Sequence, residues 1–238
     1  AVVVDHLLDL PIAQLVVADT RVALGQLGAF NRQHFFGQVV AVTGSAGKTS
    51  VKEMLSVMFS SLAPTLATRG NLNNDIGAPL TLLELSPKNE FAVIELGASA
   101  VGEIDYTSAL TQPHVAILNN AMDAHVEGFG SLENIVQAKS EIYDGLVNSG
   151  IGIVNLDDPH AHIWTEKLDR LQKRWIGFGL NDSAELTATN VSVNDRGCFG
   201  FTLHYKSQQY DVQLAVMGRH MVSNALAAIA AWVASGQS

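Results

Sequence analysis

Cysteine, basic residues and long apolar runs are all scarce in this chain. The single cysteine, Cys198, excludes an internal disulfide and favours a reducing compartment. Only 14 lysines and arginines stand against 23 aspartates and glutamates, a net charge of -9, which argues against a nucleic-acid partner bound through a broad basic surface. No run is long enough for a membrane span or a signal peptide. We therefore expect a cytoplasmic protein with neither a membrane nor a nucleic-acid partner.

The apolar content that is present predicts a full α/β core, since 47% of the 238 residues are hydrophobic. From residue 39 to about 178, short and nearly all-apolar runs alternate with helical segments, as is typical of parallel strands covered on both faces. This alternation predicts a doubly wound, mostly parallel sheet. The apolar runs are 39–43, 91–96, 115–119 and 151–155, and the helical segments include 102–110 and 131–147.

The pattern changes from about residue 184. Apolar and polar residues partly alternate in 185–193, 200–205 and 210–216, which predicts a small antiparallel addition to the sheet. The alanine-rich segment 219–234 is expected to be a helix.

A glycine-rich turn between an apolar run and a helical pattern is the most informative stretch. The apolar run ends near Thr43, and a helix is expected to start near Lys48. The N–H groups of such a turn and the positive end of the helix dipole point at one spot, where phosphate binds. The stretch therefore predicts a nucleotide site, with Lys48 on the terminal phosphates and the Thr49 hydroxyl on magnesium. The loop residues are Gly44, Ser45, Ala46, Gly47, Lys48, Thr49 and Ser50.

This loop departs from the usual Walker A pattern, because Val42 stands where that pattern has its first glycine. We interpret it as a shortened variant; the alternative is a tight turn with a solvated lysine. The flanking strand and helix favour the nucleotide. The expected apolar face of the helix consists of Val51, Met54, Leu55, Met58 and Leu62.

Polar residues follow the ends of the next predicted strands. Glu95 ends one strand, Asn119 and Asn120 end the following one, and Asp123 and His125 lie in the adjoining loop. Because ligands of open α/β sheets bind beyond the carboxyl ends of the strands, Glu95 is a candidate magnesium ligand. For Glu95, the alternative is that its carboxylate only caps the next turn. For His125, the alternative is that its side chain only forms a hydrogen bond within its loop.

Lys139 interrupts an apolar face. In the expected helix 131–147 it lies on the stripe formed by Leu132, Ile135, Ile142 and Leu146. The lysine either extends its ammonium to the surface, or faces the nucleotide site, where it pairs with phosphate or is chemically modified.

Two further polar stretches are candidates for the cleft. The first is the asparagine-rich loop around Asn71, Asn73 and Asn74. The alternative for this loop is a turn without a role in binding. The second is the start of the last helix, where Arg219 and His220 precede Asn224, a candidate partner for an adenine edge. The alternative there is a solvated helix start.

Six blocks of this sequence, in order over nearly the whole chain, resemble the Mur ligase family. Within that family, two runs favour the member that adds D-alanyl-D-alanine: Asn73-Asn74-Asp75-Ile76-Gly77 and Glu127-Gly128-Phe129-Gly130. The blocks are Thr43 to Ser50, Gly70 to Gly77, Val93 to Ala98, His125 to Ser131, Ala138 to Ile142 and Gly218 to Leu226.

The resemblance implies an ATP-dependent amide ligase of peptidoglycan precursor synthesis that joins D-Ala-D-Ala to a UDP-N-acetylmuramoyl-tripeptide through an acyl phosphate, releasing ADP and phosphate. It implies that Lys48 contacts the phosphates, that Thr49 and Glu95 hold one Mg²⁺, and that His125 helps to bind a second. Lys139 matches the lysine that is carbamylated in this family. The resemblance also implies that Asn73 and Asn74 line the cleft and that Asn224 contacts adenine, with Arg219 and His220 nearby.

The resemblance further implies three domains, of which residues 38–238 match the central, ATP-binding one. Residues 1–37 look like the tail of an N-terminal UDP-binding domain and a linking helix, and a C-terminal ligase domain is not represented. We expect a monomer that binds ATP without completing ligation. The alternatives are another Mur-type ligase, an ATP-hydrolysing switch or transport module, and a nucleotide-binding module without ligase activity.

Overall fold

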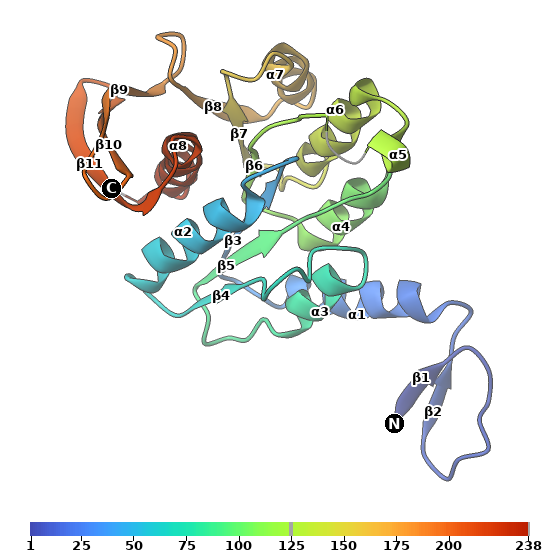
Figure 1. Cartoon of the computed structure of the whole chain (residues 1–238). Coiled ribbons are helices and arrows are strands. Elements are labelled where there is room, and N and C mark those ends of the chain that lie inside the picture. The colour runs from blue at the N-terminus through green and yellow to red at the C-terminus, as the bar shows by residue number, and fades with distance from the viewer. Residues whose placement is uncertain (124–125, 238) are drawn as a thin grey trace.

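The computed structural model describes residues 1–123 and 126–237. Its strands, in chain order, are β1 (Val2–Val4), β2 (Gln14–Val16), β3 (Gln38–Thr43), β4 (Thr65–Ala67), β5 (Phe91–Glu95), β6 (Val115–Leu118), β7 (Ile151–Asn155), β8 (Arg174–Gly179), β9 (Leu186–Val193), β10 (Cys198–Tyr205) and β11 (Gln208–Met217). Nine of them form one sheet in the order β11-β10-β9-β8-β7-β6-β3-β5-β4. The strands from β4 to β9 pair in parallel, which confirms the predicted doubly wound sheet (Figure 1).

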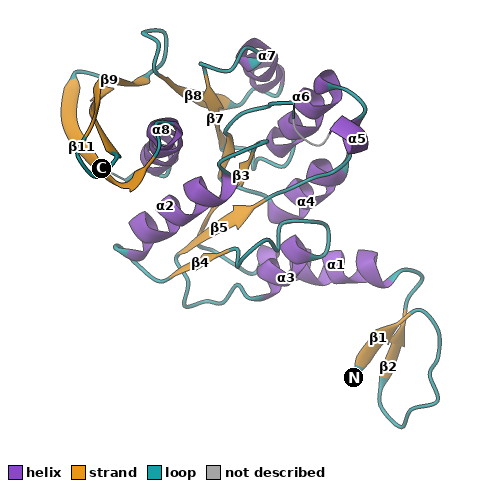
Figure 2. Cartoon of the chain, viewed as in Figure 1, coloured by secondary structure: helices purple, strands orange, loops and turns teal. Residues whose placement is uncertain are grey.

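Helices cover both faces of this sheet (Figure 2). They are α1 (Thr20–Gln33), α2 (Lys48–Ser60), α3 (Gly77–Leu83), α4 (Glu103–Thr111), α5 (Val126–Phe129), α6 (Leu132–Ser140), the 3₁₀ turn η1 (Glu141–Tyr143), α7 (Ala161–Arg170) and α8 (His220–Ala234). One core lies under α2 and α8, and the other lies under α3, α4, α6 and α7, so the strands between them are buried on both sides. None of the helices described is long and apolar enough to cross a membrane.

The order of the strands reverses at β3. The chain leaves β3 through α2, continues to β4 and β5 on one side, and later places β6 on the other side of β3. The carboxyl ends of β3, β5 and β6 therefore meet at Thr43, Glu95 and Leu118. This is the position at which doubly wound sheets bind their ligands.

The antiparallel addition is also as predicted. β9, β10 and β11 pair in antiparallel fashion and curve around α8 (Figure 1). α8 is rich in alanine, and its small buried side chains let it lie close to the strands that surround it.

Two details of the expected helices are wrong. The helix expected over 131–147 ends at Ser140, where the chain tightens into η1 and the Glu141 carboxylate turns back to accept N–H groups of Gly102 and Asp105 at the start of α4. Leu62 lies beyond the end of α2 and is 52% exposed, whereas Val51 and Leu55 are fully buried as expected.

The first residues form a separate unit that α1 connects to the rest. β1 and β2 pair in parallel, and α1 begins after Asp19, whose carboxylate accepts N–H groups of Arg21 and Val22. The buried Arg32 guanidinium then donates to the carbonyl oxygens of Thr111 and Gln112, which fixes α1 to the end of α4.

Candidate active site

The glycine-rich turn forms a loop between β3 and α2. Gly47 has a φ of +79°, a left-handed conformation, and a Cβ atom there would lie 2.5 Å from the Asn224 side-chain oxygen, so only glycine fits. α2 has no side-chain cap, which leaves its first N–H groups directed out of the helix. Lys48 lies folded over the loop, with its Nζ donating to the Gly44 carbonyl oxygen at 2.8 Å. Burial lowers the Lys48 pKa, and the nearby Glu95 carboxylate opposes that shift.

Asparagines at the end of β6 hold the loop in shape. The Asn120 side-chain oxygen accepts the Ala46 N–H at 2.9 Å, and its backbone oxygen accepts the Ser45 N–H. The Asn119 side-chain amide donates to the Ala46 carbonyl oxygen at 3.0 Å and to the Asn224 side-chain oxygen at 2.9 Å. Asn119, Asn120 and Asn224 therefore fix the loop that the sequence assigned to phosphate.

Glu95 ends β5 with its carboxylate almost completely buried, at 2% exposure. Its Oε1 accepts the side-chain amide of Asn73 at 2.7 Å, whereas Oε2 has no hydrogen-bond partner among the residues that the structure describes. Within the same described part of the chain, the Thr43 hydroxyl and the Asn119 side-chain oxygen also lack partners. Orphaned buried oxygens at the ends of β3, β5 and β6 suit a hard cation or its bound water.

Lys48 and Lys139 meet at one cavity of about 380 Å³. Lys139 is 4% exposed, its ammonium makes no hydrogen bond with any group that the structure describes, and its Nζ lies 5.2 Å from the centre of the Phe129 ring. Burial, followed by the positive charge of Lys48, lowers the Lys139 pKa to about 8, while Glu103 and Glu141 oppose the shift. The cavity is lined by Gly44, Ser45, Lys48, Asn71, Asn73, Asn74, Gly97, Ala98, Ser99, Glu103, Phe129 and Lys139.

A second cavity, of about 700 Å³, adjoins the other side of the loop. His220, Asn224 and Asp158 contribute to its wall together with Ala46 and Gly47. It is large enough to take a heterocyclic base next to a phosphate on the loop. Asn224 is 4% exposed, and its side-chain nitrogen faces the Met221 sulfur at 3.4 Å.

Comparison with known proteins assigns the chain to a family. Residues 42–232 match the model of the Mur ligase middle domain. The chain belongs to the Mur ligase family. The UDP-N-acetylmuramoyl-tripeptide--D-alanyl-D-alanine ligase of Escherichia coli (strain K12) is 47% identical over 230 residues, which are 97% of this chain and 50% of that protein. The enzyme of the same name from Haemophilus influenzae is 43% identical over 226 residues, 93% of this chain and 48% of that protein.

Solved structures of Mur ligases agree with the fold. A crystal structure of MurF from Acinetobacter baumannii superposes with a TM-score of 0.95 at 45% identity, over 99% of this chain and 51% of that one. The MurF ligase from Thermotoga maritima in complex with ADP superposes with a TM-score of 0.90 at 26% identity, over 100% of this chain and 55% of that one. The chain thus spans about half the length of the relatives it matches.

The Mur ligase fold brings most of the predicted site residues together at this edge of the sheet. Asn73 donates to Glu95, and Asn74 accepts N–H groups of Ile76 and Gly77 at the start of α3, although both also line the first cavity. Arg219 is exposed and is not part of the wall of the second cavity, unlike His220. Thr49 is exposed in the first turn of α2.

His125 lies outside the described residues, so its predicted metal contact stays a prediction. Among residues 1–123 and 126–237, no three His, Cys, Asp or Glu side chains gather into a metal cluster.

Sequence reasoning missed two acidic residues at this edge of the sheet. Glu103 lines the first cavity and accepts the Ser99 N–H at 2.7 Å. Asp158 follows β7, accepts the Ala121 N–H at 2.9 Å and lines the second cavity. The rule that identified Glu95, polar residues just after a strand, would also have found Asp158.

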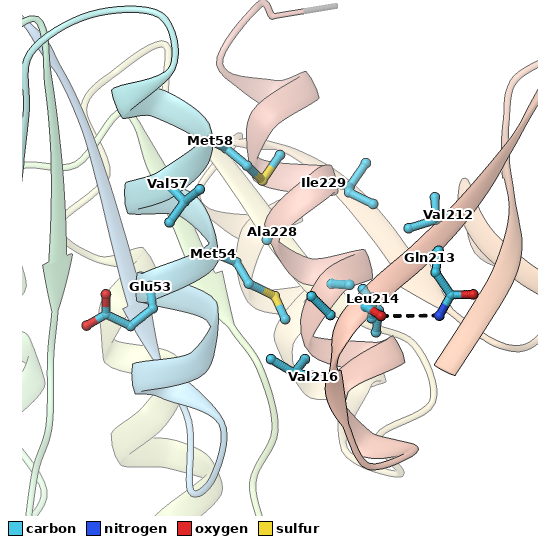
Figure 3. Close-up of a pocket in the computed structure, with 12 residues that line it drawn as sticks. Glu53, Met54, Val57, Met58, Val212, Gln213, Leu214, Val216, Ala228 and Ile229 are labelled. Atoms are coloured by element: carbon cyan, nitrogen blue, oxygen red, sulfur yellow. Dashed lines mark hydrogen bonds between the residues drawn. The ribbon is translucent and has the colours of Figure 1, made fainter. Parts of the chain in front are cut away.

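An apolar hollow of about 550 Å³ lies elsewhere, between α2, α8 and β11 (Figure 3). Met54 and Met58 of α2 face Ile229 of α8 and Leu214 of β11 across it. It has almost no groups for acid, base or phosphate chemistry, and it lies on the α2 and α8 face of the sheet, away from Lys139. The polar cavities at the carboxyl ends of the strands are therefore the candidate site.

Proposed function

We propose that this chain is the ATP-binding part of an amide ligase of peptidoglycan precursor synthesis. One observation carries the proposal: Lys48 of α2 and Lys139 of α6 converge on one cavity, and Glu95, close to Lys48, has a carboxylate oxygen without a hydrogen-bond partner in the described chain. Membership in the Mur ligase family and the ADP complex of the Thermotoga maritima relative support ATP as the nucleotide.

In this proposal the phosphates of ATP lie on residues 44–50. The uncapped start of α2 supplies N–H donors, and Lys48 supplies a positive charge once it leaves the Gly44 carbonyl oxygen. The base lies in the second cavity, near Asn224, His220 and Arg219. Since the Asn224 side chain already bonds to Asn119, its contribution is to the floor of that cavity.

The residues at the strand ends fit magnesium. The buried Oε2 of Glu95, which has no hydrogen-bond partner among the described residues, is the kind of oxygen that this cation prefers, and Thr49 offers a hydroxyl at the start of α2. Glu95 and Thr49 would hold one ion, and His125 is proposed for a second. When bound, Mg²⁺ supplies charge neutralisation at the transferred phosphoryl group.

We also propose that Lys139 is carbamylated. The ammonium would first lose a proton; the neutral amine would then add to carbon dioxide, forming an N–C bond and releasing a second proton, so that a buried cation becomes an anion. The lowered pKa, about 8, makes the neutral amine more abundant at physiological pH than for an ordinary lysine. The change removes the repulsion between Lys139 and Lys48 and adds a carboxylate to the cavity.

The reaction proposed is formation of an amide bond in two steps. A peptide carboxylate oxygen attacks the γ-phosphorus of ATP, and ADP leaves, giving an acyl phosphate. The amine of the second substrate then attacks the acyl carbon; phosphate leaves, and the amine gives up a proton. Lys48 and the N–H groups of the loop stabilise negative charge on the phosphoryl oxygens during the first step.

The names of the relatives indicate the substrates. They support UDP-N-acetylmuramoyl-tripeptide as the acid and D-alanyl-D-alanine as the amine. Because the chain spans about half of those relatives, ligation is proposed for the protein at their length, with residues 38–238 as its central domain and residues 1–37 as the end of a UDP-binding domain and a linking helix. We propose that the protein acts as a cytoplasmic monomer.

The first test is calorimetric titration of Mg-ATP into this chain and into Lys48→Ala. We expect magnesium-dependent binding that the variant weakens at least tenfold, whereas Lys88→Ala, which removes an exposed lysine far from the loop, should bind like the unmodified chain. Equal binding by all three would contradict the assignment of the loop.

The second test is ligation itself. D-alanyl-D-alanine and a UDP-N-acetylmuramoyl-tripeptide are supplied to the protein at the length of its relatives, and phosphate release and product mass are followed. We expect phosphate and product in equal amounts. Phosphate release that does not depend on the two substrates would instead favour an ATP-hydrolysing module. The 238 residues alone are expected to bind ATP without forming product.

A further inference from the structure

Lys52 is one of the most buried side chains of the molecule, at 1% exposure, although it carries a charge. It lies in α2 one turn after Lys48. Its Nζ donates to the Thr68 carbonyl oxygen at 3.0 Å and to the Glu53 carboxylate at 2.6 Å. A buried ammonium near the positive end of a helix is unfavourable unless its hydrogen bonds do something for the fold.

The acceptor of that bond, Thr68, is itself bound to Glu95. Thr68 follows β4, which is only three residues long and is the outermost strand on that side of the sheet. The Thr68 N–H donates to the Val93 carbonyl oxygen at 3.0 Å, and its hydroxyl oxygen accepts the Glu95 N–H at 2.9 Å. The Glu95 main chain is therefore fixed by a residue at the end of a short edge strand.

β4 has a strand partner on one side only, β5, and α2 packs against it. Lys52 adds a hydrogen bond to that packing at the end of the strand, since its ammonium connects the Thr68 carbonyl to α2. The contacts run from Lys52 to Thr68 and from Thr68 to Glu95. The Asn73 amide on Oε1 then orients the carboxylate.

We propose that Lys52 is a positioning residue that fixes Glu95, through Thr68, relative to the phosphate loop. This inference rests on the proposed function, in which Glu95 holds magnesium and Lys48 holds phosphate. Lys48 and Lys52 lie one turn apart on the same helix, so the group that binds phosphate and the group that holds the metal ligand belong to one rigid frame. Loss of Lys52 then weakens the effect of magnesium on nucleotide binding more than nucleotide binding itself.

Hydrogen exchange in the chain without metal and nucleotide tests the frame directly. In Lys52→Met, the Glu95 amide should exchange about tenfold faster, while amides in the middle of β6 keep their protection and show that the variant is folded. Lys173→Met is the matched control, because Lys173 also donates to a backbone carbonyl, that of Val147, but just before β7 and β8, which β6 and β3 separate from β5 and β4. An unchanged Glu95 amide in folded Lys52→Met would overturn the inference.

The second measurement is calorimetry with ADP, with and without Mg²⁺. Outer-shell partners of metal ligands typically change metal affinity about 10- to 100-fold, so Lys52→Met should reduce the gain in ADP affinity from Mg²⁺ about tenfold. Binding without Mg²⁺ should change less than about twofold. Thr68→Val, which removes the hydroxyl that accepts the Glu95 N–H, should lose the magnesium gain to the same extent. Thr68→Ser, which keeps the hydroxyl, should retain it. These two variants test the contact between Thr68 and Glu95 if Lys52→Met does not fold.

The two measurements separate the inference from the function on which it rests. If the unmodified chain shows no magnesium-dependent ADP binding, the proposed function is overturned, and hydrogen exchange still decides whether Lys52 fixes Glu95. If the unmodified chain binds as expected and folded Lys52→Met keeps the full magnesium gain, the positioning role is overturned while the proposed function stands.

Discussion

Two lysines of this molecule are buried to nearly the same extent but in opposite surroundings. Lys52 in α2 has two hydrogen-bond acceptors, the Thr68 carbonyl oxygen and the Glu53 carboxylate. Lys139 in α6 has none in the described part of the chain, and only the Phe129 ring lies under its ammonium. A buried charge with its acceptors in place strengthens a framework, whereas one without them is held ready for a ligand or a reaction. Burial alone does not separate these two roles; the hydrogen bonds do.

The largest difference should appear in catalysis. In the protein at the length of its relatives, Lys139→Met and Lys139→Arg should both lower the ligation rate by about 10²- to 10³-fold, because neither side chain can carry a carbamate at the site of phosphoryl transfer. Ligation rates of the two variants and of Lys52→Met give the comparison, and Lys52→Met should lose only about tenfold. A Lys139→Arg variant that retained most of its activity would show that the site needs a cation, not a carbamate.

The modification itself is checked by mass. Intact-protein mass spectrometry of the unmodified chain after incubation with bicarbonate should find the added carbon dioxide, and Lys139→Arg should not take it up. Lys88, which is exposed, serves as the internal comparison for a lysine of ordinary reactivity.

For stability, the order of the two lysines should be the reverse of that for ligation: replacing Lys52 should cost more than replacing Lys139. Lys52→Met leaves the buried Thr68 carbonyl without its donor and should reduce the free energy of unfolding by about 2 kcal/mol. Lys139→Met removes a buried charge that has no acceptor in the described chain, so stability should stay the same or rise by about 1–2 kcal/mol. Urea unfolding at neutral pH measures both values. Equal destabilisation by the two substitutions would show that the hydrogen bonds of Lys52 do not stabilise the fold more than the buried charge of Lys139 does.

Much of this arrangement could be predicted from the sequence, because the signals are local. The apolar run before Gly44 and the helical pattern after Gly47 predict the loop between β3 and α2, and Lys139 is conspicuous on an apolar stripe. Lys52 gave no such signal, since its acceptor Thr68 lies in another segment of the chain, just after β4. Asn73 was predicted at the cleft, but its bond to Glu95 depends on how the loop before α3 approaches the end of β5. Contacts between distant segments decide those roles, and periodicity does not contain them.

A pH series sharpens the comparison further. The Lys139 pKa in the folded chain is lowered from 10.5 to about 8, so between those values the unfolded chain binds more protons than the folded one. Stability of the unmodified chain relative to Lys139→Met should therefore rise as pH increases from about 8 toward 10.5, by about 3 kcal/mol at most. Unfolding curves of the two proteins across that range, in carbonate-free buffer, measure the difference; a flat difference would mean that the ammonium is well solvated.

The smallest effect is expected at the acidic partner of Lys52. The Glu53 side chain is 63% exposed, and a pair with one partner in solvent contributes little, so Glu53→Gln should change the free energy of unfolding by less than about 0.5 kcal/mol. It should also leave the magnesium gain in ADP affinity as it is in the unmodified chain. Urea unfolding and ADP calorimetry of this variant beside Lys52→Met then identify which of the two bonds matters. If Glu53→Gln matched Lys52→Met, the ion pair would be what holds the lysine in place; if it did not, the Thr68 carbonyl is the contact through which Lys52 acts on Glu95.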